Sequence, residues 1–174
     1  MANWERIVSQ YGPLVWATAY RLLGSQDDAC DCFQETFLVA LEVSRRERVR
    51  NLPGLLRHLA TARALDGLRR RRQVASGGHL ADWSTIPCGN PGPVQQAADA
   101  ELAARLRRAL AQLPPRQAEA LCARYLEGLS YRRIGRRLNL RVGAVSALLH
   151  RAHERLRKML EAEEEAETDE VHNG

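Results

Sequence analysis

The chain of 174 residues has no long apolar run and few aromatic side chains, which make up 5% of it. Because it contains no stretch of about 18 apolar residues, a membrane span is not expected. The first six residues lack the basic start and apolar run of a signal peptide. We therefore expect a cytoplasmic protein without membrane contact, long enough for one ordinary domain or two small ones.

Residues that hold metals or cofactors are also sparse. The four cysteines show no paired C-x-x-C spacing, and the five histidines show no ligand spacing with acids or thiols. No glycine-rich phosphate loop and no nucleophile motif occurs. The sequence therefore predicts no metal, no cofactor, no catalytic residue and no enzyme activity. The cysteines are interpreted as reduced thiols in or near a core.

What the chain does have is positive charge, and this charge is unevenly distributed. The net charge is +5, made up of +4 over residues 1–72, −1 over 73–98, +9 over 99–160 and −7 over 161–174. A basic body indicates a polyanionic partner such as a nucleic acid, whereas the alternative is a solvated helix surface.

Apolar residues recur at three- and four-residue steps in both halves, which predicts helices and no strands. Residues 73–98 between them contain the glycines and prolines typical of a linker. The predicted fold class is all-α. We expect two small helical domains at residues 1–72 and 99–160, a flexible linker at 73–98 and an acidic disordered tail at 161–174.

Local signals also predict where the helices begin and end. Gly24 is expected to end the first helix, and Ser25 or Asp27 to begin the second. Asn51 and Pro53 mark the start of a third helix. The last helix is expected over residues 142–160.

Residues 129–152 carry the sharpest local pattern, in which a helix of about eight residues, a three-residue turn and a longer helix follow one another. In such a helix-turn-helix the second helix lies in the major groove of DNA. A plain helical hairpin with solubilising arginines is the alternative. The apolar positions expected between the two helices are Ile134, Leu138, Leu140, Val145 and Leu149. The residues expected to contact DNA are Arg132, Arg133, Arg141, Ser146, His150, Arg151 and Arg155.

An acidic face is expected on the second helix of the chain. Asp28, Asp31 and Glu35 follow one another at steps of three and four, so they share one side of that helix, with the Gln34 amide beside them. Such a face is poor for DNA and suits a basic protein partner. A solvated surface is the alternative.

Both halves resemble one protein family, the extracytoplasmic-function (ECF) sigma factors. The matching C-terminal segments are Leu113-Pro114-Pro115-Arg116-Gln117, Glu127-Gly128-Leu129-Ser130-Tyr131-Arg132-Arg133-Ile134, Val142-Gly143-Ala144-Val145 and Leu149-His150-Arg151-Ala152. The matching N-terminal segments are Tyr11-Gly12-Pro13-Leu14-Val15 and Asp28-Ala29-Cys30-Asp31-Cys32-Phe33-Gln34-Glu35-Thr36-Phe37-Leu38, followed by Asp66 and the arginines after it. The two stretches occur in the family's order, with a linker where the family has one.

The resemblance implies an alternative sigma factor that binds core RNA polymerase and directs promoter-specific transcription initiation. The polymerase partner would be the clamp coiled coil of the largest subunit, and many relatives are also held by an anti-sigma factor. The N-terminal domain would melt the promoter and read a flipped base, and the C-terminal domain would read the minus-thirty-five element. The implied polymerase contacts are Asp28, Asp31, Gln34, Glu35 and Phe37. The implied DNA contacts in the N-terminal domain are Arg57, His58, Arg63, Arg69, Arg70, Arg71 and Arg72.

Several residues depart from the family pattern. Leu55 and Ala62 stand where the family usually has Trp and Asn, and the recognition helix has Ala144, Ser146, Ala147 and Leu148 where polar or basic residues are usual. We interpret these as base- or phosphate-facing positions with few hydrogen-bond donors. Two other functions therefore stay open: a helix-turn-helix regulator that acts without polymerase, and a degenerate sigma-like protein that binds polymerase or an anti-sigma factor without reading a promoter.

Overall fold

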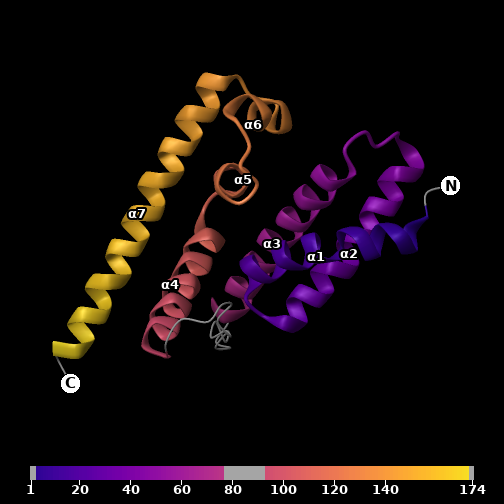
Figure 1. Ribbon diagram of the computed structural model, residues 1–174. Coiled ribbons are helices and arrows are strands. Elements are labelled where there is room, and N and C mark those ends of the chain that lie inside the picture. The colour runs from indigo at the N-terminus through magenta and orange to yellow at the C-terminus, as the bar shows by residue number, and fades with distance from the viewer. Residues whose placement is uncertain (1–2, 77–92, 173–174) are drawn as a thin grey trace. The chain divides into compact units, whose positions relative to one another are not determined.

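The computed structural model describes residues 3–76 and 93–172, and within these ranges every regular element is a helix (Figure 1). The chain divides into two compact units, Met1–Ala100 and Glu101–Gly174. The predicted all-α fold class is confirmed. Most of the predicted linker, residues 77–92, lies outside the described residues. Over the described ranges, no helix combines the length and the apolar character that crossing a membrane requires.

Three long helices pack against one another in the N-terminal unit: α1 (Trp4–Leu23), α2 (Gln26–Arg46) and α3 (Leu52–Ser76). Their ends follow the local signals. Gly24 adopts a left-handed conformation with φ 68° and donates its backbone N–H to Tyr20, which ends α1. The Ser25 hydroxyl accepts the N–H of Asp28 at the start of α2, and the Asn51 amide oxygen accepts the N–H of Gly54 at the start of α3. The predicted helix ends at Gly24, Ser25 and Asn51 are confirmed.

The core of this unit lies where the three helices meet. Its central residues are buried, and Leu56 is the largest fully buried side chain among them: Val15, Phe37, Ala40, Leu56 and Ala60. The Phe33 and Phe37 rings meet edge to face with centroids 4.9 Å apart. Burying one such leucine or phenylalanine contributes about 2 kcal/mol, so this apolar cluster fixes the positions of α2 and α3.

The C-terminal unit contains shorter helices joined by tight turns. After α4 (Pro93–Gln112), which belongs to this unit from Glu101 on, come α5 (Pro115–Tyr125), α6 (Tyr131–Leu138) and α7 (Val142–His172). Pro115 occupies the first turn of α5, where its missing N–H costs nothing. Gly128 takes φ 66° before Ser130, whose hydroxyl accepts the Arg133 N–H and begins α6. Gly128 and Ser130 thus separate α5 from α6.

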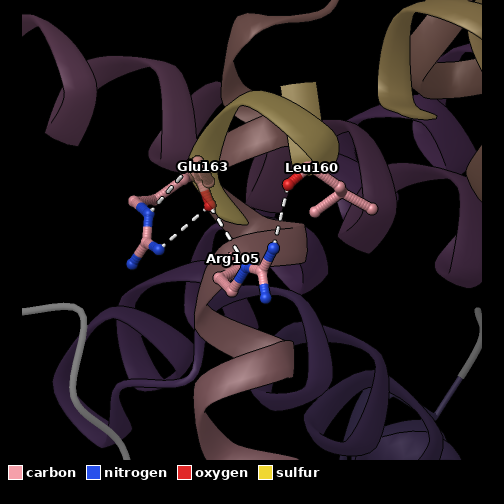
Figure 2. Close-up of polar contacts among 4 residues, drawn as sticks. Arg105, Leu160 and Glu163 are labelled. Carbon is pink, nitrogen blue, oxygen red and sulfur yellow. Dashed lines mark hydrogen bonds and ion pairs between the residues drawn. The ribbon is translucent and has the colours of Figure 1, made fainter. Parts of the chain in front are cut away.

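Three expected boundaries are wrong. Helix α3 continues to Ser76, α4 begins at Pro93, and α7 continues past Leu160 to His172, where a disordered acidic tail was expected. Basic residues of α4 contact the acidic end of α7 (Figure 2). Arg108 donates to both carboxylate oxygens of Glu163 at 3.3 and 3.1 Å. Arg105 donates to the Leu160 carbonyl at 2.9 Å and lies 3.5 Å from the Glu163 carboxylate.

Candidate protein and nucleic-acid interfaces

The predicted acidic face is present on the surface of α2. Asp31, Gln34 and Glu35 are exposed along one side of this helix. Leu38 continues the same side one turn further and is 62% exposed, the kind of apolar side chain that anchors a protein interface. Sequence reasoning did not assign Leu38 a role. The available signal was its spacing, because Leu38 follows Gln34 by four residues and Glu35 by three and so shares their side of the helix.

Phe37 does not belong to this surface, which corrects the sequence interpretation. It is only 7% exposed and packs in the core against Phe33. Leu38, the next residue, is exposed instead, because successive helical residues are rotated by about 100°. Phe37 therefore supports the acidic face from inside.

A groove of about 410 Å³ runs between α2 and α3, and it brings the two predicted sets of contacts together. One wall carries acids of α2 and the other carries arginines of α3: Asp28, Asp31, Glu35, Arg63, Arg70 and Arg71. Arg63 Nε lies 3.9 Å from a Glu35 carboxylate oxygen, and both side chains are well exposed. This open pair is weak, since exposed ion pairs contribute about 0.2–1 kcal/mol.

The second pair across the groove is more enclosed. Arg71 Nη2 forms an ion pair with the Asp28 carboxylate, and the two side chains are 23% and 38% exposed. Arg71 Nη1 donates to the backbone carbonyl of Leu23 at 3.2 Å. Asp28 and Arg71, predicted to contact different partners, are therefore bound to each other.

The remaining predicted DNA contacts of this unit lie along α3. Arg57, Arg70 and Arg72 are exposed, whereas His58 is half-buried. Arg69 is also half-buried, and its Nη1 donates to the Asp66 carboxylate at 3.0 Å. Arg57 and Arg70 offer exposed charge for phosphates, and Arg69 is bound to a carboxylate of the same helix.

Two cysteines lie close together on α2 in contrasting environments. Cys30 is exposed, whereas Cys32 is buried and its thiol donates to the Ala60 carbonyl across the α2–α3 contact. Burial raises the pKa of Cys32 from the ordinary 9.0 to about 11. Cys32 and Cys122 are buried, as predicted, whereas Cys30 is exposed, and Cys88 lies outside the described residues. Across residues 3–76 and 93–172, no group of three or more His, Cys, Asp or Glu side chains could hold a metal ion.

In the C-terminal unit, the turn between α6 and α7 has the geometry of a helix-turn-helix. Asn139 takes the left-handed conformation with φ 54° and ends α6, and the Leu140 N–H then donates to the Gly135 carbonyl at 2.8 Å. A Cβ at position 135 would lie 2.6 Å from the Leu140 carbonyl oxygen, so the turn requires glycine there. Ile134, Leu138, Val145 and Leu149 are buried between the helices, as predicted.

A buried ion pair holds α6 against the preceding turn. Arg137 donates to both carboxylate oxygens of Glu127 at 2.6 and 2.8 Å, and the two side chains are 17% and 4% exposed. This two-pronged geometry is the strong form of the arginine–carboxylate interaction. Arg137 lies close in sequence to the arginines predicted to contact DNA, but its own charge is balanced within the fold.

The predicted DNA contacts of this unit are all exposed. They surround the turn and the first half of α7: Arg132, Arg133, Arg141, Ser146, His150, Arg151 and Arg155. His150 lies 3.6 Å from the Glu154 carboxylate. Ala144 and Ala147 are also exposed, in agreement with their interpretation as DNA-facing positions. Leu148 is only 9% exposed and packs inward, so the DNA-facing position expected for it is wrong. Val142, at the start of α7, is an exposed apolar residue that sequence reasoning did not single out.

Two family models match the two units in order. The Sigma-70 region 2 model matches residues 7–74, and the Sigma-70 region 4 model matches residues 103–156. The chain is also 36% identical over 162 residues to the ECF RNA polymerase sigma factor SigE of Mycolicibacterium smegmatis, an alignment that covers 92% of this chain. The chain belongs to the ECF sigma factors. It is 28% identical over 162 residues to the ECF sigma factor SigW of Bacillus subtilis, covering 88% of this chain and 87% of SigW.

The ECF sigma factor described here spans 62% of the length of SigE. A solved structure has the same fold: the sigma factor RpoE from Bartonella quintana, crystallised with the anti-sigma factor NepR. It is similar with a TM-score of 0.59 and 21% identity, over 92% of this chain and 98% of that one. At this identity the likeness shows the fold alone.

Proposed function

We propose that this ECF sigma factor binds core RNA polymerase and directs promoter-specific initiation of transcription. The observation that carries the proposal is the order of its two units, region 2 followed by region 4, each with an exposed charged surface of the required sign. Residues 1–72 would bind polymerase and melt DNA, and residues 99–160 would bind the minus-thirty-five element. The protein works in the cytoplasm, where the polymerase is.

The polymerase interface we propose is the outward side of α2. It consists of Asp31, Gln34, Glu35 and Leu38, which combine negative charge with one apolar anchor. A basic coiled coil, such as the clamp of the largest subunit, complements such a surface in charge. The polymerase makes the RNA, so the chain itself needs no catalytic residue.

The DNA interface we propose has two parts. In the N-terminal unit, Arg57, Arg70 and Arg72 are exposed on α3 and would hold phosphates beside the melted strands. In the C-terminal unit, the start of α7 would enter the major groove, with arginines on both sides of it. Binding by this many cations depends steeply on salt concentration.

A second candidate function is supported by one observation. The exposed side of α7 near its start has Gly143, Ala144 and Ala147, which offer no side-chain donor or acceptor to base edges. A sigma-like protein that binds polymerase without reading a promoter would tolerate these residues. An anti-sigma factor as a further partner stays a prediction from the resemblance.

Sequencing of DNA selected from a random library by polymerase carrying this protein tests the proposal, followed by run-off transcription from the selected DNA. We expect an enriched sequence and transcripts that start at a fixed distance from it. Core binding without enrichment or run-off products would instead favour the sigma-like interaction protein. DNA binding without core binding would favour a regulator that acts without polymerase.

A further inference from the structure

The Arg71 guanidinium ties together all three helices of the N-terminal unit. It pairs with Asp28 in the first turn of α2 and donates to the carbonyl of Leu23, the last residue of α1. Arg71 itself lies near the end of α3. The arrangement also suits the helix dipoles, since the cation lies at the carboxyl end of α1 and the anion lies at the amino end of α2.

A close backbone approach supports the same contact. Gly67 lies one turn before Arg71 on α3, and a Cβ there would lie 3.1 Å from a methyl carbon of Leu23. The Leu23 side chain would have to shift by a few tenths of an ångström to admit a Cβ at position 67, so α3 lies close to the turn between α1 and α2. Gly67 and Arg71 therefore mark one side of α3 that is fitted to this turn.

In this geometry the charges of Arg71 and Asp28 are paired with each other. Arg71 and Asp28 each already have a charged partner, and a phosphate or a basic partner that took either charge out of the pair would leave the other one partly buried. Asp31 and Arg70, next to them in the same groove, are exposed. Asp28 and Arg71 thus pair within the fold, whereas Asp31 and Arg70 face solvent.

We infer that Asp28 is a positioning residue that acts on DNA contact through Arg71 and makes no polymerase contact itself. By fixing the last turns of α3 against the α1–α2 turn, the pair sets the direction in which the exposed Arg70 and Arg72 point. The inference rests on the proposed function and reassigns two residues that the sequence places in separate interfaces.

The test compares Asp28→Asn and Arg71→Gln with Asp27→Asn, a matched control that removes one exposed carboxylate from the same helical turn. Affinity for core polymerase and open-complex yield at saturating core are measured on DNA selected with the wild-type protein. We expect both variants to keep core affinity within about twofold of wild type and to lose open-complex yield about fivefold, as for one partly exposed ion pair. Asp31→Asn is expected to lower core affinity about tenfold.

Two further variants separate positioning from general damage. The double variant Asp28→Asn with Arg71→Gln should be no worse than either single variant, because the two residues act as one unit. Asp28→Glu, which keeps the carboxylate, should restore most of the open-complex yield. If Asp28→Asn does not fold, Arg71→Lys replaces it in the same comparison. Lysine keeps the positive charge but lacks the planar guanidinium that contacts both Asp28 and the Leu23 carbonyl.

Hydrogen exchange of the free protein gives a readout that does not need polymerase. Amides in the last two turns of α3 should exchange faster in Asp28→Asn than in Asp27→Asn. A loss of core affinity in Asp28→Asn equal to that in Asp31→Asn would overturn the inference, as would an Asp28→Asn protein that behaves like the control. A wild-type chain that forms no complex with core polymerase would instead overturn the proposed function.

Discussion

The two units of this ECF sigma factor use their charges differently. In the N-terminal unit, arginines of α3 face acids of α2 across an open groove, so that two of the predicted DNA contacts are paired with predicted polymerase contacts. In the C-terminal unit, one buried pair, Glu127 with Arg137, holds the turn, and the arginines around α7 face solvent. Each unit thus has charged motif residues that pair within the fold and others that stay exposed.

The units also differ in what holds them together. Long helices around a core of Val15, Phe37 and Leu56 form the N-terminal unit, whereas the C-terminal unit depends on tight turns at Gly128, Gly135 and Asn139. We therefore expect single substitutions in the turns to cost the C-terminal unit more than loss of an open ion pair costs the N-terminal unit.

The largest effect is expected from Gly135→Val. Its side chain would overlap the Leu140 carbonyl, since even a Cβ would lie 2.6 Å from that oxygen. We expect the C-terminal unit to lose about 4 kcal/mol of unfolding free energy, measured by chemical denaturation. Gly143→Ala is the control, because a Cβ there meets nothing within 4 Å. Equal stability of the two variants would contradict the proposed geometry of the turn.

Next in size is the contrast between a buried and an open ion pair. Glu127→Gln leaves the enclosed Arg137 without its carboxylate and should cost about 3 kcal/mol. Glu35→Gln removes the exposed partner of Arg63, so it should cost less than about 0.5 kcal/mol. Denaturation of both variants measures the difference, and similar losses would show that the two units do not differ in this respect.

A smaller, pH-dependent effect is expected at the α2–α3 contact. Because burial raises the pKa of Cys32 from 9.0 to about 11, the unfolded chain releases this proton at a lower pH than the folded chain. The contribution of the thiol to stability is complete below pH 9 and is lost as the pH rises towards 11. The difference in unfolding free energy between wild type and Cys32→Ala should therefore fall by about 1 kcal/mol between about pH 9.5 and 10.5. A pH-independent difference would show that Cys32 is not buried.

The smallest effect concerns a single exposed arginine near the recognition helix. Arg151→Gln should weaken binding to duplex DNA several-fold and lower the slope of log affinity against log salt by about one. Lys158→Gln removes one exposed charge further along α7 and is the control. Binding isotherms at several salt concentrations measure the slope. An unchanged slope for Arg151→Gln would remove this residue from the DNA interface.

The sequence predicted much of the fold because helix ends depend on local signals. Gly24, Ser25, Asn51 and Ser130 each act within one turn of their own position, so their roles were visible without a structure. The end of α7 was predicted wrongly for the opposite reason. Acids at the carboxyl end of a helix are unfavourable by themselves, and the distant Arg105 and Arg108 pair with one of them, Glu163 (Figure 2).

The candidate interfaces were predicted in outline but not residue by residue. Helical steps correctly placed Asp31, Gln34 and Glu35 on one exposed side of α2. The family resemblance gave the wrong side for Phe37 and Leu148, because motif matching cannot tell an apolar side chain that meets a partner from one that fills the core. The pairing of Asp28 with Arg71 joins two helices, and no local pattern encodes it.

Affinity for core RNA polymerase after charge reversal on α2 tests the central claim most directly. The variant Asp31→Arg with Glu35→Arg is compared with Glu5→Arg with Glu47→Arg, which changes the net charge equally at exposed sites away from this face. Circular dichroism confirms that both are folded, and titration of labelled protein with core polymerase gives the affinities. We expect the α2 variant to lose affinity by about 100-fold or more, because like charges then face each other across the interface, and the control to bind like wild type. Equal affinities for the two variants would contradict the polymerase interface on α2.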